Sequence, residues 1–377
     1  MIVDKARAEQ LSDILSRVAL QLDIPEYLTR EIIAKYDEIG AWLNEPGSAL
    51  TEYDPRIYSQ GSFRLGTAIR PVSDSADYDI DSVCVLVIAK EQTTQYDLKH
   101  QVGDRLKDNG SYRRVLTEGR RCWTLTYNEF HLDVLPAIPN AKGGENSILI
   151  TDKELRLWQP SNPVDYSTWF FARMSGQFQQ ERERLARVLK ADVEDVPEWK
   201  VRTPLQRVVQ LLKRHRDIYF ADDQNDKPIS IILTTLAAHA YNDEPDLFEA
   251  LFNVAFHMED FIEDVNGKRW VRNPVDPREN FADKWDTNPQ REENFYLWLD
   301  QLKADIERAE RTLGIHNIGA LFGERLGTQV VQKAVNENMN ALYRQRESGQ
   351  LKMGAGTGTL GTTGAVTVLK HTNFGED

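Results

Sequence analysis

The segment that most constrains the fold of this chain is an apolar run that begins with alternating aspartates. The run DYDIDSVCVLVI spans residues 77–88, and its second half is β-branched and almost continuously apolar. A stretch of this kind is typical of a strand that is buried on both faces of a sheet. The sequence therefore predicts a strand over residues 80–88 with acidic side chains at its start.

Asp79 and Asp81 are two residues apart where this predicted strand begins, so both carboxylates should point to the same face of the sheet. Two anions held this close repel each other, and burying them without a cation would raise the pKa of one and destabilise the fold. Carboxylate oxygens are the ligands that Mg²⁺ and Mn²⁺ prefer. The pair therefore predicts a divalent cation site.

A third aspartate interrupts a later apolar segment. Residues 120–139, RRCWTLTYNEFHLDVLPAIP, read as two strands joined around Asn128 and Glu129, and Asp133 lies inside the second of them. Aspartate is disfavoured inside a strand, which indicates a specific role for it. If Asp133 meets the Asp-x-Asp pair, the three carboxylates could hold two ions, the arrangement that serves in-line phosphoryl transfer.

The aspartates between residues 77 and 81 could also belong to an EF-hand loop or to a solvated turn. Asp77, Asp79 and Asp81 imitate the start of an EF-hand loop, but its sixth and twelfth positions would be Ser82 and Ile88 instead of glycine and glutamate. An EF-hand is therefore excluded. Solvated aspartates in a turn explain Asp77 well and explain Asp81 poorly, because Asp81 lies inside the strand run. From the acidic residues alone, a solvated turn stays open beside the metal site.

A glycine-serine pair stands ahead of the acidic strand, in the segment QGSFRLGTAI. Gly61 would let the backbone approach a phosphate closely, and the hydroxyl and N–H of Ser62 could bind phosphate oxygens, above all if the pair begins a helix. Such a pair alone is usually a turn. Together with an Asp-x-Asp on the next strand, it predicts a phosphate cradle that faces a metal site.

Composition excludes several classes of protein. The charged fraction is 28% and the formal net charge is −13, which opposes a protein that coats DNA or RNA. A small anionic ligand held by local lysines and a metal remains compatible with this charge. No apolar run approaches the roughly 20 residues of a membrane span, and the N-terminal segment lacks the apolar centre of a signal peptide. We therefore expect a cytoplasmic protein with no membrane partner.

The only cysteines are Cys84 and Cys122, and the sequence holds neither a C-x-x-C motif nor histidines at ligand spacing. A zinc site is therefore not expected. Both cysteines are predicted to be reduced and to pack as small apolar side chains on strands.

Helical periodicity marks most of the remaining chain. The predicted helices lie near residues 11–22, 28–43, 94–108, 204–220, 229–241, 290–313 and 328–347. The first part of the chain therefore combines strands and helices, and from about residue 165 the chain is helical. We expect a core with N-terminal helices over residues 1–164, a helical lobe over 165–347 and a flexible tail over 348–377.

The expected tail is rich in glycine, since six of the 22 glycines of the chain fall between residues 349 and 364. This composition is typical of a flexible tether. The tether would end in a short β-prone segment over residues 366–369. The alternative to a disordered tail is a peptide that adds a strand to the sheet of a partner.

Taken together, QGSFRLGT, then DYDID, then a lone aspartate on a later strand resemble the nucleotidyltransferase superfamily that includes DNA polymerase beta. The segments VQLLKRHRDIYF and KPISIILTTLAA are similar to the second lobe of the cGAS/DncV-like bacterial nucleotidyltransferases, the CD-NTases. The resemblance covers most of residues 10–345. It implies an α+β fold with two lobes, a mixed-sheet catalytic core and a helical second lobe, and an active site in the cleft between them.

The resemblance also assigns roles to particular residues. It implies that Asp79 and Asp81 bind the metal pair and that Asp133 helps to deprotonate the attacking ribose hydroxyl. The residues that it implies for nucleotide binding are Gln60, Gly61 and Ser62 in the core, and Lys213 and Ser230 in the second lobe. From the residues alone, Lys213 could equally be a solvated lysine in the run from Lys213 to Arg216, and Ser230 a helix N-cap.

Members of this family make cyclic di- or trinucleotides from ATP and other NTPs, with two Mg²⁺ ions, and in bacteria the product activates an effector in antiphage defence. Some work with a HORMA-like or ubiquitin-transfer-like partner, which the tail could bind here. Ile231 stands where some animal relatives place a base-stacking aromatic residue, and the zinc insertion of the DNA-sensing members is missing, so no DNA activator is expected. The alternatives are adenylylation of a protein or small molecule, RNA tailing, and a catalytically dead binding module.

Overall fold

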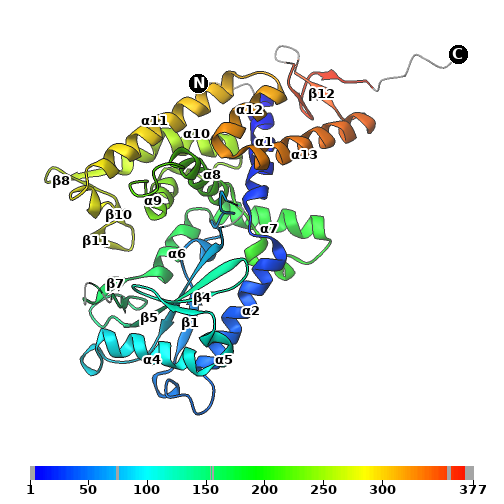
Figure 1. Ribbon diagram of the computed structural model, residues 1–377. Helices are drawn as coiled ribbons and strands as arrows, with labels where there is room; N and C mark the ends of the chain where they lie inside the picture. Colours follow the sequence, from blue (N-terminus) through cyan, green and yellow to red (C-terminus); the bar gives the residue numbers. More distant parts are fainter. Residues whose placement is uncertain (1–4, 74–75, 153, 155–156, 355–357, 370–377) are drawn as a thin grey trace. The chain divides into compact units, whose positions relative to one another are not determined.

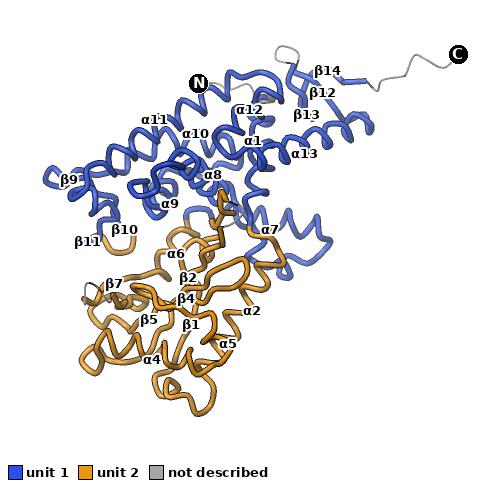
Figure 2. Tube along the Cα trace, in the orientation of Figure 1, with its two compact units in different colours: residues 1–23, 173–273, 278–377 blue, residues 24–172, 274–277 orange. Residues whose placement is uncertain are grey.

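The computed structural model describes residues 5–73, 76–152, 154, 157–354 and 358–369. The chain forms two compact units (Figure 1, Figure 2). One unit, here called the sheet unit, consists of residues 24–172 and 274–277, and the other, the helical unit, consists of residues 1–23, 173–273 and 278–377. Among the described residues, none of the helices combines the length and the apolarity that crossing a membrane requires.

The sheet unit is built on a seven-stranded mixed sheet with the order β1-β2-β5-β4-β3, to which β6 and β7 are added beyond β5. Strands β2 and β5 are parallel, and the other paired strands are antiparallel. The strands are β1 (Arg56–Ser59), β2 (Tyr78–Val85), β3 (Leu116–Glu118), β4 (Trp123–Thr126), β5 (Phe130–Pro139), β6 (Ile148–Ile150) and β7 (Gln159–Ser161). The predicted apolar strand and the predicted hairpin around Asn128 and Glu129 are confirmed.

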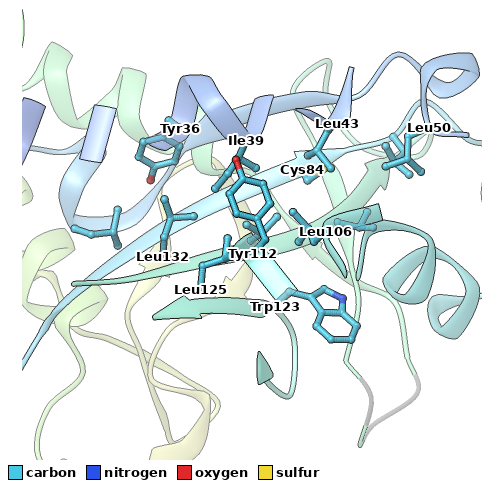
Figure 3. Close-up of a cluster of buried hydrophobic side chains, with 14 of the residues drawn as sticks. Tyr36, Ile39, Leu43, Leu50, Cys84, Leu106, Tyr112, Trp123, Leu125 and Leu132 are labelled. Carbon is cyan, nitrogen blue, oxygen red and sulfur yellow. The ribbon is translucent and has the colours of Figure 1, made fainter. Parts of the chain in front are cut away.

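One face of this sheet is covered by two helices, α2 (Glu26–Leu43) and α4 (Gln95–Asp108). The apolar stripe of α2 packs with strand residues such as Cys84 and Leu132 in a single buried cluster (Figure 3). Since side chains alternate along a strand, the intervening residues of β2 and β5 must occupy the opposite face. The unit also contains α3 (Gly61–Arg64), α5 (Gly110–Arg113) and α6 (Pro163–Ala172).

The helical unit contains eight α-helices among the described residues. They are α1 (Lys5–Leu22), α7 (Ser175–Leu189), α8 (Pro204–Tyr219), α9 (Ser230–Ala240), α10 (Leu247–His257), α11 (Gln290–Arg311), α12 (Ile315–Leu326) and α13 (Thr328–Glu347). Short strands follow α10, namely β8 (Glu263–Val265), β9 (Lys268–Trp270), β10 (Arg272–Asn273) and β11 (Asp276–Asn280), of which β11 begins within residues 274–277 of the sheet unit. The helices predicted near 204–220, 229–241, 290–313 and 328–347 are confirmed, whereas α7, α10 and α12 were not predicted.

The first helix belongs to the helical unit, and not to the sheet unit with α2. Its predicted stripe is buried, with Leu11 and Val18 fully enclosed, and α1 packs on α10 and α13. Ser12 Oγ donates to Asp246 Oδ1 at 2.6 Å, which ties α1 to the start of α10. The compact units thus divide the chain differently from the expected boundary at residues 164 and 165. An apolar stripe predicts that a helix is buried but does not identify the surface that buries it.

The basic run on α8 is buried. Lys213, Arg214, His215 and Arg216 are each at most 5% exposed, so the alternative interpretation of Lys213 as a solvated lysine is wrong. His215 shows how one of these groups is accommodated: Trp298 Nε1 donates to His215 Nδ1 at 2.9 Å, and His215 Nε2 lies 3.2 Å from Asp305 Oδ2. Burial lowers the pKa of His215 despite the neighbouring Asp305. The imidazole is therefore neutral and donates through Nε2.

Part of the expected tail is folded onto the chain itself. Strands β12 (Lys352–Met353), β13 (Leu360–Gly361) and β14 (Val366–Thr367) form a small antiparallel sheet with β12 in the middle. Thr363 Oγ1 donates to Glu9 Oε2 of α1 at 2.5 Å. The β-prone segment that could add a strand to a partner therefore pairs with β12 of its own chain. Residues 355–357 and 370–377 of the tail lie outside the described residues.

Candidate active site

The predicted acidic residues meet on one face of the sheet. Parallel pairing of β2 with β5 sets Asp81 in register with Asp133, and Asp79 in register with His131. One carboxylate oxygen from each of Asp79, Asp81 and Asp133 lies within 4.8 Å of the others. These three residues, called the acidic triad below, come from segments about 50 positions apart that only strand pairing brings together.

The electrostatics of the acidic triad fit a bound cation. Burial of the carboxylate raises the pKa of Asp79, the Asp133 carboxylate raises it further, and His131 lowers it. His131, which is in register with Asp79, has its Nε2 3.1 Å from Asp77 Oδ2. Oxygen donors with excess negative charge are the set that Mg²⁺ or Mn²⁺ binds, so the residues present fit a divalent ion.

The glycine-serine turn packs directly against the triad. Gln60 N donates to the backbone oxygen of Asp81 at 3.0 Å, and the hydroxyl of Tyr36 on α2 donates to the same oxygen at 2.6 Å. Gly61 has a φ of +61°, and a Cβ built on it would lie 2.5 Å from Asp81 Oδ2. Glycine is therefore required both by the backbone conformation and by the approach of the carboxylate.

Ser62 follows at the same turn, and its backbone oxygen accepts hydrogen bonds from the N–H groups of Thr67 and Ala68 at 2.9 and 3.1 Å. These bonds fix the loop beside the triad. The helix that begins at Gly61 is four residues long. The predicted cradle thus has Gly61 packed against Asp81, and Ser62 follows it on a single turn of helix.

Asp133 is held by two side chains that the sequence analysis did not assign to the site. Thr124 Oγ1 donates to Asp133 Oδ1 at 2.5 Å, and Cys122 Sγ donates to Asp133 Oδ2 at 3.0 Å. Burial and this contact with Asp133 raise the pKa of the Cys122 thiol to about 12. Cys122 was predicted to be an apolar packing residue, and the structure adds a polar contact at the triad. Cys84 is the apolar, fully buried residue that was predicted.

Lys213 and Ser230 belong to the helical unit. Lys213 is 5% exposed on α8, and Ser230 is the first residue of α9. The alternative interpretation of Ser230 as an N-cap is wrong, since Ile229 occupies that position. Ser230 Oγ instead accepts a hydrogen bond from Arg216 Nη1 at 2.9 Å. The sequence analysis named Arg216 only as part of the basic run. Arg216 lies one turn after Lys213, and this spacing could have indicated that both side chains lie on the same side of α8.

Comparison with known proteins identifies the domain that carries the triad. Residues 9–173 match the SMODS family, described as the Second Messenger Oligonucleotide or Dinucleotide Synthetase domain. Over 355 residues the chain is 29% identical to a c-di-GMP synthase of Roseivirga ehrenbergii, covering 93% of each protein. It is 27% identical to the cyclic dinucleotide synthase CdnG of Bradyrhizobium diazoefficiens, covering 99% of this chain and 96% of that protein.

Solved structures share the fold. The CD-NTase CdnG of Bradyrhizobium diazoefficiens, solved in complex with GTP, has a TM-score of 0.72 at 23% identity and covers 87% of this chain and 99% of that one. CdnC of E. coli MS115-1, solved in a complex with a HORMA protein, has a TM-score of 0.59 at 15% identity and covers 84% of this chain and 96% of that one. The resemblance noted in the sequence is confirmed. The chain thus matches the SMODS family over residues 9–173, and over more than nine tenths of its length it is similar to a c-di-GMP synthase and to a cyclic dinucleotide synthase.

Proposed function

We propose that this protein is a cyclic oligonucleotide synthase that joins nucleoside triphosphates through its acidic triad and releases pyrophosphate. The observation that carries the proposal is the register of β2 with β5, which sets Asp81 beside Asp133. Three carboxylates with ligand atoms within 4.8 Å of one another, next to a turn in which a glycine packs on one of them, suit a metal-bound triphosphate.

In this proposal Asp79, Asp81 and Asp133 hold two Mg²⁺ ions, which Mn²⁺ could replace. When bound, the ions neutralise charge on the triphosphate and on the departing pyrophosphate. Asp133 accepts the proton of the ribose hydroxyl that attacks the α-phosphorus of the donor nucleotide. The new P–O bond forms as the bond to the pyrophosphate breaks. A second transfer of the same kind closes the ring.

We assign the donor triphosphate to the turn that contains Gln60, Gly61 and Ser62. Gly61 lets the backbone approach the triphosphate closely, and the hydroxyl of Ser62 can donate to a phosphate oxygen. In the helical unit we assign nucleotide binding to Lys213 and Ser230. Their support is the family resemblance, together with the hydrogen bond by which Arg216 holds the hydroxyl of Ser230. Replacing Lys213 by methionine should raise the KM for the nucleotide.

The curated relatives favour a cyclic dinucleotide. One is named a c-di-GMP synthase, the other a cyclic dinucleotide synthase, and both match more than nine tenths of this chain. We therefore expect GTP among the substrates, in addition to the ATP that the family resemblance implies. Analysis of the product formed from labelled NTPs determines its ring size and base composition.

The test is to incubate the purified chain with α-³²P-labelled NTPs, singly and mixed, in the presence of Mg²⁺. The product is then treated with phosphatase and with linkage-specific nucleases. We expect a phosphatase-resistant cyclic product that requires metal and incorporates label from GTP. A monoadenylated protein or small molecule would instead indicate the adenylylating alternative, and a ladder on added RNA would indicate tailing. If no NTP yields any product, the proposed function is wrong.

We further propose that the product serves antiphage signalling and that residues 349–377 help to bind a HORMA-like or ubiquitin-transfer-like partner. The support is the HORMA complex of CdnC, and strand β14, which lies on the outside of the small tail sheet. A chain that ends at Ser348 should lose partner binding in a pull-down while its basal synthesis persists. Unchanged binding by the shortened chain would exclude this role of the tail.

A further inference from the structure

The acidic triad is part of a larger polar surface to which a third strand contributes. Antiparallel pairing of β4 with β5 sets Thr124 opposite Asp133 and Thr126 opposite His131. Paired residues on neighbouring strands project to the same face of a sheet. Strand β4 therefore borders the triad on the side opposite β2, which carries Asp81.

Both oxygens of the Asp133 carboxylate accept hydrogen bonds from this strand and the residue just before it. Thr124 Oγ1 donates to Oδ1 at 2.5 Å, and Cys122 Sγ donates to Oδ2 at 3.0 Å. From the other side, Ser82 Oγ on β2 donates to the backbone oxygen of Asp133 at 2.7 Å. Asp133 is thus fixed by donors from both sides of β5.

These contacts matter because the terminal torsion of an aspartate is broad and only weakly restrained by itself. Two donors, one on each oxygen, define a single orientation of the carboxylate. Each oxygen has two lone pairs, so one can accept the hydrogen bond while another faces a cation. Groups that orient a metal ligand in this way typically change metal affinity or activity about 10- to 100-fold when removed.

The neighbours of Cys122 explain why a cysteine is suited to this position. Its side chain packs against an apolar cluster of β2, β5 and β6 that includes Val83 and Leu135, while its sulfur reaches Asp133. A cysteine offers an apolar surface to the cluster together with a weak S–H donor to the carboxylate. It therefore serves both neighbours at the boundary between the apolar and the polar part of this face.

We propose that Thr124 and Cys122 are positioning residues, which hold the Asp133 carboxylate in the orientation that completes the metal site with Asp79 and Asp81. This inference rests on the proposed function, because it assigns a role within the same site. It adds β4 to the elements that build the site. Neither side chain is assigned a contact with substrate.

The experiment compares variants that remove each donor with variants that keep it, in the full-length protein. Thr124→Val and Cys122→Ala remove a donor, and Thr124→Ser and Cys122→Ser retain one. Thr126→Val is the matched control. Thr126 lies on the same face of β4 as Thr124, but it is in register with His131, which is not a member of the triad. Mn²⁺ binding is measured by electron paramagnetic resonance without nucleotide, and kcat and KM are measured at saturating Mg²⁺.

We expect Thr124→Val and Cys122→Ala each to weaken Mn²⁺ affinity and to lower kcat by about 10-fold, and the double variant by up to about 100-fold. The KM for nucleotide should change less than kcat. The two serine variants and Thr126→Val should stay within about threefold of the wild type, because each retains the donors to Asp133.

Wild-type Mn²⁺ affinity and kcat in both donor-removing variants would overturn the inference. Equal losses in the serine variants would also overturn it, since packing and not hydrogen bonding would then be responsible. Each donor has its own variants, so if one variant misfolds the other still decides. If the wild type itself neither binds Mn²⁺ nor forms product, the proposed function fails. Metal binding and synthesis that survive the loss of both donors would refute the positioning role alone.

Discussion

Replacing Asp81 by asparagine should lower product formation by at least about 1,000-fold while the protein stays folded. The substitution removes one carboxylate charge from the acidic triad and leaves the size of the side chain almost unchanged. A catalytic divalent ion contributes several kcal/mol to the transition state, and each ~1.4 kcal/mol corresponds to a factor of ten in rate. The measurement is product formed per enzyme from labelled NTPs at saturating Mg²⁺.

The thermal midpoint in EDTA separates loss of catalysis from loss of folding. Without a cation the three carboxylates repel one another across less than 4.8 Å, so removing one charge should leave the midpoint unchanged or raise it. Asp104→Asn is the matched control, because it removes the same charge from an exposed position of α4 that pairs with Lys107. That control should keep full activity. Substantial synthesis by Asp81→Asn would exclude Asp81 as a metal ligand.

Replacing Gly61 by alanine should lower activity by about 10- to 100-fold, because the new methyl group displaces the carboxylate of Asp81, the proposed metal ligand. The Cβ would lie 2.5 Å from Asp81 Oδ2, closer than real Cβ contacts come, so the carboxylate must move away from the triad. Misplacing a catalytic group by about 1 Å typically costs about 100-fold in rate. The measurement is kcat, together with Mn²⁺ affinity without nucleotide.

Backbone strain must be distinguished from this displacement, since Gly61 has a φ of +61°. A left-handed conformation costs a residue with a Cβ about 1–2 kcal/mol of stability. Gly47→Ala is the matched control, because Gly47 has a φ of +91° and a Cβ there meets nothing within 4 Å. Both variants should lose stability, and only Gly61→Ala should lose activity. If Gly61→Ala is destabilised but fully active, the turn does not position Asp81.

The hairpin that the sequence predicts also contains a signal for one of the residues that hold Asp133. The hairpin turns at Asn128 and Glu129, and pairing counted outward from that turn places Thr124 opposite Asp133, as the structure does. A positioning residue could therefore have been identified from the predicted hairpin. No comparable count could place Cys122, which reaches Asp133 from a position beyond the end of β4.

Local periodicity alone identified the buried stripes of α1 and α2, the strand that carries Asp79 and Asp81, and the common face of these two carboxylates. These features depend on residues a few positions apart, where the geometry of a helix or strand is fixed. Tertiary structure decided that α1 packs with α10 and α13, that the basic run on α8 is buried, and that part of the tail pairs with its own chain. It also decided that Asp133 completes the triad, because the register of two parallel strands about 50 residues apart depends on the packing of the whole sheet and not on either segment alone.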